Sequence, residues 1–136
     1  MPIVGHGIDI VFGNEDEIRT LSRIQRMLDE HGEQFLARCF TDGERAVGEG
    51  GRRYHEHLAA RFAAKEAVMK ALGTGLSEGI AWTDCEVVRE ATGAPRLMLY
   101  REALQAAMRL GATRWHVSLS HSDHYAVASV VLERVS

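Results

Sequence analysis

The chain has little cysteine and little proline, and it has no long uncharged apolar run. Its 136 residues include two cysteines and two prolines. Cys39 and Cys85 form no Cys-x-x-Cys pair, so we expect neither a disulfide framework nor a thiolate metal site. A reducing compartment follows, most simply the cytoplasm. No stretch of 18 residues lacks charge or strong polarity, and the first residues have no basic region, so we expect neither a membrane span nor a signal peptide.

The charge balance also excludes a function class. The formal net charge of -3 argues against a general nucleic-acid binder, which would need a strongly basic surface. The hydrophobic fraction of 46% and the charged fraction of 26% are typical of a globular protein. A chain of this length buries enough surface to form a core without disulfides or a structural metal. Because it contains no repeat, low-complexity tract or linker, we expect a single domain over residues 1–136.

Hydrophobic periodicity and turn residues predict a mixture of helices and strands. We expect strands at 3–11, 82–89, 96–100, 114–120 and 125–134, and helices at 14–32, 33–39, 41–47, 54–72 and 102–110. The elements do not follow a strict strand–helix alternation. This order predicts an α+β fold with a largely antiparallel sheet packed against the long helix 54–72 and the shorter helices.

Two places carry charge where apolar residues are expected. Asp9 lies between isoleucines in the first strand, where a carboxylate is costly unless it is paired or coordinated; the alternative is a local turn or an arginine partner. In the helix 54–72, Arg61, Lys65, Glu66 and Lys70 interrupt an alanine-rich, apolar sequence. These charges either form ordinary ion pairs on a solvated face or mark a site for phosphate and Mg²⁺, which takes few carboxylates and bridges to phosphates.

A third segment, residues 118–125, holds serine, histidine and aspartate close together. A hydrolase triad is a poor interpretation, since adjacent triad members rarely meet and no Gly-x-Ser-x-Gly is present. A hydroxyl-rich turn with a histidine that contacts a phosphate or the backbone fits better, with a capped hairpin at Ser122 and Asp123 as the alternative. The glycines at 73 and 75 form no Walker loop, and those at 5 and 7 form no dinucleotide fingerprint.

Four segments together resemble one family. They are residues 7–10 (Gly-Ile-Asp-Ile), 38–44 (Arg-Cys-Phe-Thr-Asp-Gly-Glu), 61–75 (from Arg-Phe-Ala-Ala-Lys-Glu to Gly-Thr-Gly) and 118–126 (Ser-Leu-Ser-His-Ser-Asp-His-Tyr-Ala). In this order they resemble the motifs of the holo-acyl-carrier-protein synthases, the small class of 4′-phosphopantetheinyl transferases. The resemblance extends over nearly the whole chain.

The resemblance implies a fold and a reaction. Such enzymes move the phosphopantetheine arm of coenzyme A to a serine of apo acyl carrier protein, as in fatty acid biosynthesis, and release adenosine 3′,5′-bisphosphate. It implies Mg²⁺ held by Asp9 and Glu66, and a homotrimer with active sites at subunit interfaces.

The resemblance also implies roles for further residues. Lys70 would contact the diphosphate and act in catalysis with Glu66, which is our candidate for the base that accepts the serine proton. Ala46 stands where some relatives carry an aspartate thought to act as that base. The remaining substrate-binding residues would be Arg61, Lys65, Gly73, Gly75 and His121.

A basic stripe recurs at helical spacing opposite the apolar face of the helix 14–32. Its members are Arg19, Arg23 and Arg26. From the residues alone, we would interpret the stripe as a solvated surface. With the resemblance, we expect it to bind the acidic carrier protein. Two other functions remain open: a non-catalytic module that binds carrier protein or coenzyme A, and a nucleotide or phosphate hydrolase.

Overall fold

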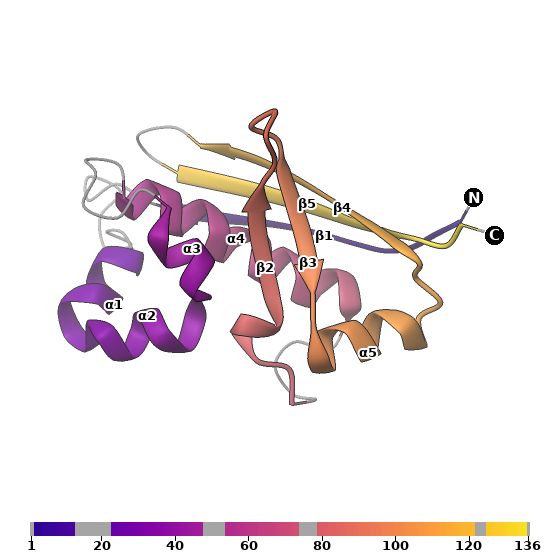
Figure 1. The fold of residues 1–136 in the computed structure, drawn as a ribbon, viewed down its shortest axis with the longest axis horizontal. Coiled ribbons are helices and arrows are strands. Elements are labelled where there is room, and N and C mark those ends of the chain that lie inside the picture. Colours follow the sequence, from indigo (N-terminus) through magenta and orange to yellow (C-terminus); the bar gives the residue numbers. More distant parts are fainter. Residues whose placement is uncertain (1, 13–22, 48–53, 74–78, 122–124, 136) are drawn as a thin grey trace.

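In the computed structural model, which describes residues 2–12, 23–47, 54–73, 79–121 and 125–135, the strands form two antiparallel sheets around one long helix (Figure 1). Helices α1 to α3 gather beside one end of that helix, and the two termini lie together at the opposite side of the molecule. The described elements are β1 (Ile3–Phe12), α1 (Arg23–His31), α2 (Glu33–Cys39), α3 (Asp42–Ala46), α4 (Tyr54–Leu72), the 3-10 turn η3 (Trp82–Asp84), β2 (Cys85–Arg89), β3 (Pro95–Leu99), α5 (Arg101–Arg109), β4 (Arg114–His121) and β5 (Tyr125–Glu133).

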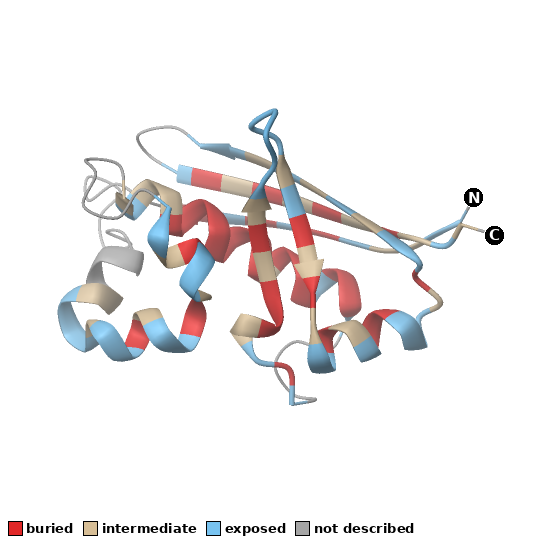
Figure 2. Ribbon diagram, in the orientation of Figure 1, coloured by how far each residue is buried: buried red, intermediate tan, exposed pale blue. Residues whose placement is uncertain are grey.

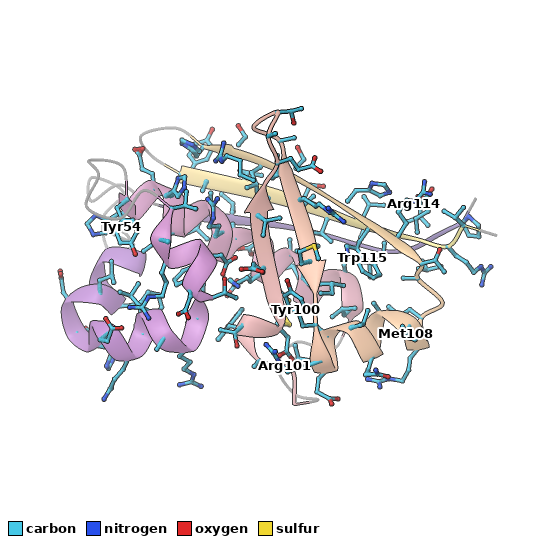
Figure 3. The ribbon with its side chains drawn as sticks, in the orientation of Figure 1. Tyr54, Tyr100, Arg101, Met108, Arg114 and Trp115 are labelled. Atoms are coloured by element: carbon cyan, nitrogen blue, oxygen red, sulfur yellow. The ribbon has the colours of Figure 1, made fainter. Side chains whose placement is uncertain are left out.

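The larger sheet has the strand order β1-β5-β4, and β2 pairs with β3 in the smaller one. Along β5, alternate residues are buried, as the two-residue period of a strand requires; they are Ala126, Ala128, Val130 and Leu132. Trp115 of β4 donates from its indole nitrogen to the carbonyl of Leu97 in β3, at 3.1 Å, and so links the two sheets (Figure 3).

Helix α4 is the centre of the core (Figure 2). Thirteen of its 19 residues are buried, including two charged ones, Arg61 and Lys65. Six of the buried residues are alanines, whose small side chains let neighbouring elements approach closely. Gly73 ends the helix with φ 78°, where a left-handed conformation suits glycine.

Strand β1 lies directly on α4 because two of its residues have no side chain. A Cβ atom added to Gly5 would lie 2.4 Å from the Ala71 carbonyl oxygen, and one added to Gly7 would lie 2.1 Å from that of Ala67. Both distances are far shorter than any real contact. The strand and the helix therefore meet backbone to backbone, and Asp9 follows two residues further along the same face of β1.

The observed elements confirm the α+β expectation, and α2 and α4 have the predicted bounds. The predicted strand 82–89 is wrong at its start, because Trp82–Asp84 forms a 3-10 turn before β2 begins. The other strand and helix ends differ by one residue or not at all, apart from the helix predicted from residue 14, whose first part lies outside the described residues. Within the described residues, no helix is both long and apolar enough to cross a membrane.

Candidate active site

Asp9 of β1 and Lys70 of α4 form an ion pair at the junction of strand and helix. The Lys70 ammonium lies 2.8 Å from Asp9 Oδ1 and donates a second hydrogen bond to the Ile8 carbonyl, at 3.0 Å. The hydrogen bond to Asp9 raises the pKa of Lys70, and the charges of Asp9 and Glu66 raise it further. The Asp9 side chain is 9% exposed and that of Lys70 is 55% exposed, so the pair joins a buried carboxylate to an ammonium that solvent reaches.

The second oxygen of Asp9 has no such partner. Asp9 Oδ2 is buried and accepts no hydrogen bond from any residue that the structure describes. A buried carboxylate oxygen without a partner is costly, and native structures rarely leave one unexplained. A bound cation would satisfy it.

Glu66 stands one helical turn before Lys70 and is half-buried. Side chains on a helix lean toward its N-terminus, so Lys70 leans toward the turn that carries Glu66. The effect of Glu66 on the pKa of Lys70 agrees with this placement. Asp9, Glu66 and Lys70 thus gather at one place, as the sequence motifs predicted for residues of one site.

The donor set at this place fits a hard cation with few protein ligands. Among the described residues, no group of three or more histidines, cysteines, aspartates and glutamates could hold a metal ion. Asp9 and Glu66 are the carboxylates whose charges raise the pKa of Lys70. Mg²⁺ is commonly bound by one or two carboxylates together with water and substrate phosphates.

Lys65 lies elsewhere than the sequence led us to expect. Its ammonium is 2.8 Å from Glu44 Oε1, and both side chains are 0% exposed. It also donates to the carbonyl oxygens of Trp82, at 3.0 Å, and of Cys85. Because an ammonium has three donors, these three oxygens leave none for a substrate. Lys65 is enclosed in the protein, whereas we had expected it against a phosphate.

Arg61 belongs to a group of cationic side chains near the first half of α4. It is 1% exposed, and burial lowers its pKa. Its Nε has no partner within the described part of the chain, and one terminal nitrogen donates to the His57 carbonyl at 3.5 Å. Burial lowers the pKa of His57 to about 4, and the charges of Arg61, Arg89 and His121 contribute.

This group brings together three elements, α4, the end of β2 and the end of β4. His57 Nε2 is also buried without a partner among the described residues. The buried Arg61 Nε, and His57 Nε2 in the tautomer that carries its proton there, are donors that can receive an anion beside Arg89. The sequence predicted Arg61 and His121 for such a role but missed His57 and Arg89. His57 could have been found from its position four residues before Arg61 on α4, whereas nothing local marks Arg89.

Several expected residues are placed only in part. Arg23 and Arg26 lie on α1, but their side chains, like all of Arg19 and Gly75, lie outside the described residues. Gly73 is exposed at the end of α4, and no atom of the described residues lies within 4 Å of the place of a Cβ. Exposed His121 ends β4.

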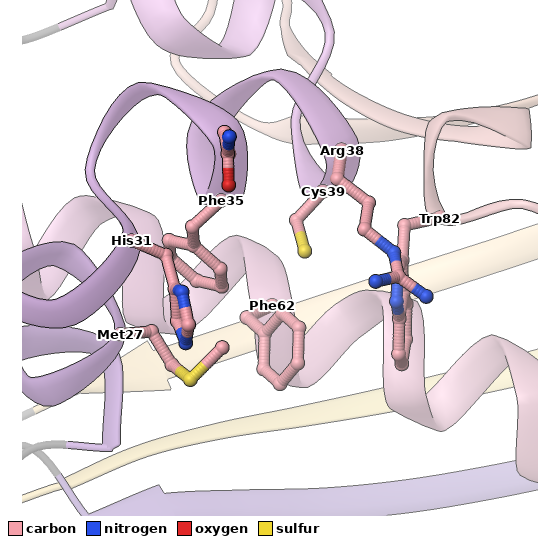
Figure 4. A pocket seen from close by; sticks show the side chains of 8 residues that line it. Met27, His31, Phe35, Arg38, Cys39, Phe62 and Trp82 are labelled. Atoms are coloured by element: carbon pink, nitrogen blue, oxygen red, sulfur yellow. The ribbon is translucent and has the colours of Figure 1, made fainter.

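A pocket opens between α1, α2, α4 and η3 (Figure 4). Its volume is about 310 Å³. Apolar side chains form most of its wall, and three polar ones, His31, Gln34 and Arg38, are exposed beside them. The full lining is Met27, His31, Gln34, Phe35, Arg38, Cys39, Phe62 and Trp82.

Comparisons with known proteins agree on one family. Residues 6–130 match the 4′-phosphopantetheinyl transferase superfamily. The holo-[acyl-carrier-protein] synthases of Koribacter versatilis and Geobacter sulfurreducens are 44% and 45% identical, over 96% and 92% of this chain and 98% and 99% of theirs. A crystal structure of the Bacillus anthracis holo-(acyl-carrier-protein) synthase in complex with CoA (3′,5′-ADP) is 41% identical and aligns with a TM-score of 0.75 over 98% of each chain.

Proposed function

Because the chain belongs to the 4′-phosphopantetheinyl transferase superfamily, we propose that it moves 4′-phosphopantetheine from coenzyme A to a serine of apo acyl carrier protein. The products are holo acyl carrier protein and adenosine 3′,5′-bisphosphate. The observation that carries the proposal is the buried oxygen of Asp9 that has no partner among the described residues, beside Lys70 and Glu66. Asp9 and Glu66 would hold Mg²⁺, which when bound neutralises charge on the diphosphate.

The reaction is a phosphoryl transfer, so the protein has to position groups and neutralise charge. The serine oxygen forms a bond to the phosphorus that carries pantetheine, and the bond from that phosphorus to the bridging oxygen breaks. The electron pair leaves with adenosine 3′,5′-bisphosphate. Lys70 can place its exposed ammonium against the diphosphate oxygens as their charge increases.

The serine proton needs an acceptor. Glu66 is half-buried beside Lys70 and is our candidate for the base. Ala46, the last residue of α3, has no side chain that could accept a proton, although some relatives carry an aspartate there. With no carboxylate at position 46, Glu66 is the base that we propose.

The cationic group would hold another phosphate of coenzyme A. We expect Arg61 and His121 to bind substrate. His57 and Arg89 belong to the same group, because the charges of Arg61, Arg89 and His121 all lower the pKa of His57. Gly73, and Gly75 beyond it, would let substrate approach the backbone after α4. For Lys65 we propose a structural contribution, since its donors are engaged by protein oxygens.

The carrier protein would dock on α1 and the pocket beside it. Arg19, Arg23 and Arg26 would face its acidic surface. Met27 and His31 of the same helix line the pocket, where exposed Arg38 adds positive charge beside an apolar wall. An acidic helix with one apolar side chain directed at the pocket has the matching chemistry.

We further propose a cytoplasmic homotrimer with active sites at the subunit interfaces. Ile8 and Ile10 are 60% and 48% exposed on the face of β1 that points away from α4, and Tyr125 of β5 is 43% exposed. An apolar sheet face of this kind needs cover. Further copies of the chain would cover it close to Asp9.

One incubation tests the transfer reaction. The protein, Mg²⁺, coenzyme A and an apo carrier protein are mixed, and the intact mass of the carrier is measured. We expect a gain of one phosphopantetheine and an equal amount of adenosine 3′,5′-bisphosphate. Binding of coenzyme A without a mass gain would indicate a non-catalytic module, and its breakdown without a mass gain would indicate a hydrolase.

A further inference from the structure

The buried pair Glu44–Lys65 is expensive, and the reaction proposed above gives it no direct part. Glu44 Oε1 accepts from the Thr41 amide at 3.0 Å, and Oε2 accepts from the Val87 amide at 2.8 Å. With the Lys65 contacts, every charged atom of the pair has a partner. Yet well-packed apolar residues commonly replace such a pair without loss of stability. Stability alone therefore does not account for it.

Large buried side chains of helix α4, such as Leu58, Phe62 and Met69, oppose its rotation, but through apolar contacts that have no preferred direction. Alanine occupies positions on most of its sides, from Ala59 and Ala60 to Ala67 and Ala71. Small side chains of nearly equal size provide few ridges that would lock one rotation about the helix axis. The contacts with Gly5 and Gly7 set how close β1 comes, but they are contacts with helix backbone.

Lys65 supplies a directional contact. Its ammonium is held at three oxygens, from α3, η3 and β2, and the next residue along α4 is Glu66. Consecutive residues in a helix project about 100° apart, so fixing the direction of one fixes that of the other. We infer that the Glu44–Lys65 pair is a positioning device that sets the rotation of α4 and thereby aims Glu66 at the cation site beside Asp9.

A small rotation of α4 should have a large effect on metal binding, because metal–ligand distances tolerate little change. A carboxylate about 6 Å from the helix axis moves by roughly 1 Å when the helix turns by about 10°. Metal ligands have to lie within about 0.2 Å of their proper distances. A small rotation that would leave the core packed would therefore withdraw Glu66 from the metal.

The turn η3 and the start of β2, whose carbonyl oxygens accept from Lys65, are also held by other side chains. Arg101 bonds to Asp84 Oδ1 at 2.9 Å, and Tyr100 donates to Glu86 Oε1 at 2.9 Å (Figure 3). Thr41 also donates to Glu86. Arg101 thus holds the same turn as Lys65, through bonds to Asp84 and to the Thr83 carbonyl. It offers a matched control.

The test compares the wild type with Lys65→Met, with Glu44→Gln/Lys65→Met and with the control Arg101→Met. The double variant removes both charges, so it leaves no buried unpaired carboxylate. Mn²⁺ binding is measured by calorimetry without substrates. The Mg²⁺ concentration for half-maximal transfer and the KM for coenzyme A are measured by the carrier-mass assay.

The double variant should fold, bind Mn²⁺ about 10- to 100-fold more weakly and need correspondingly more Mg²⁺, because residues that orient a metal ligand commonly have effects of this size. Its KM for coenzyme A at saturating Mg²⁺ should change less than about threefold. Arg101→Met should lower the melting temperature and leave Mn²⁺ affinity unchanged.

Wild-type Mn²⁺ affinity in the double variant would overturn the inference, as would equal losses in Arg101→Met. A double variant that fails to fold would overturn it too, since the pair would then serve the fold itself. The inference rests on the proposed function, and the two can fail separately. A wild type that binds Mn²⁺ but transfers nothing contradicts the function alone, while one that binds no Mn²⁺ contradicts the cation site as well.

Discussion

At the scale of single residues, Lys70 stands between a buried carboxylate and solvent. It bonds to Asp9, is influenced by Glu66 and remains half-exposed. An ammonium in this position can neutralise Asp9 when substrate is absent and contact a phosphate when it is present. The raised pKa keeps it charged throughout the physiological range.

Replacing Lys70 tests this role. Lys70→Ala should lower kcat/KM by about 2–4 kcal/mol of transition-state stabilisation, as for a single lost donor to a developing anion. Lys70→Arg should restore part of the loss, because the planar guanidinium differs in shape from a compact ammonium. Steady-state kinetics measure both. A Lys70→Ala enzyme within about twofold of wild type would reduce the residue to an exposed ion pair, worth about 0–1 kcal/mol.

The lowered pKa of His57 predicts how the stability of the protein depends on pH. Burial lowers its pKa to about 4 in the folded protein, against an ordinary value of 6.5. Between these values the unfolded chain binds a proton that the folded chain does not, so the free energy of unfolding should fall as pH decreases from about 6.5 to 4. His57→Gln should show a shallower fall. Urea unfolding at pH 4.5 to 7.5 measures both chains, and parallel curves would contradict the shift.

The sequence predicted part of this site. Asp9, Glu66 and Lys70 stand out because charge interrupts apolar patterns, and the structure brings them together. The same reasoning misjudged Lys65, since its partner Glu44 is distant in sequence and only the fold joins them. Arg89 joins the group around His57 from the end of strand β2. No hydrophobic periodicity in the sequence marks this position as part of a site.

At the scale of elements, α4 and β1 depend on each other. The bounds of α4 were predictable from its composition and the glycine that follows. Its contacts were not, because many of its buried positions are alanines, which mark the apolar side of a helix only weakly. The glycines of β1 mark where the strand contacts the helix, but this becomes clear only in the folded structure.

Gly7→Ala should damage the site through this contact. The added methyl group would lie 2.1 Å from the Ala67 oxygen and 2.8 Å from the Ala71 nitrogen, both backbone atoms that cannot rotate away. Overpacking of this kind typically costs about 1–3 kcal/mol of unfolding free energy, or more. The strand should move and carry Asp9 with it, so transfer should fall even where the variant is fully folded.

Gly111→Ala is the matched control. Gly111 follows α5 with φ 85°, and the added methyl group would lie 3.6 Å from the flexible Arg134 side chain. It should lose a similar amount of stability through backbone strain and keep its activity. Equal activity losses in the two variants, measured below both melting temperatures, would contradict the special role of Gly7.

At the scale of the whole molecule, the exposed apolar face of β1 predicts assembly. Ile10→Glu places a charge on that face without touching the buried side of the strand. The proposed trimer should dissociate, and transfer should fall with it if the active sites are interfacial. Sedimentation velocity measures the assembly, and Met108→Glu, at a 57% exposed residue of α5, is the control. An Ile10→Glu chain that sediments as a wild-type trimer would contradict this interface.

We propose that Asp9, whose buried Oδ2 has no partner in the described part of the chain, belongs to a metal-dependent transfer site. The most direct test of this proposal is single-turnover transfer by Asp9→Asn, followed by intact mass of the carrier protein at a fixed Mg²⁺ concentration. The substitution keeps the size of the side chain and removes its charge. We predict a loss of at least about 100-fold, consistent with several kcal/mol of lost charge stabilisation, in a protein whose circular dichroism is unchanged. Transfer within a few-fold of wild type would contradict the account.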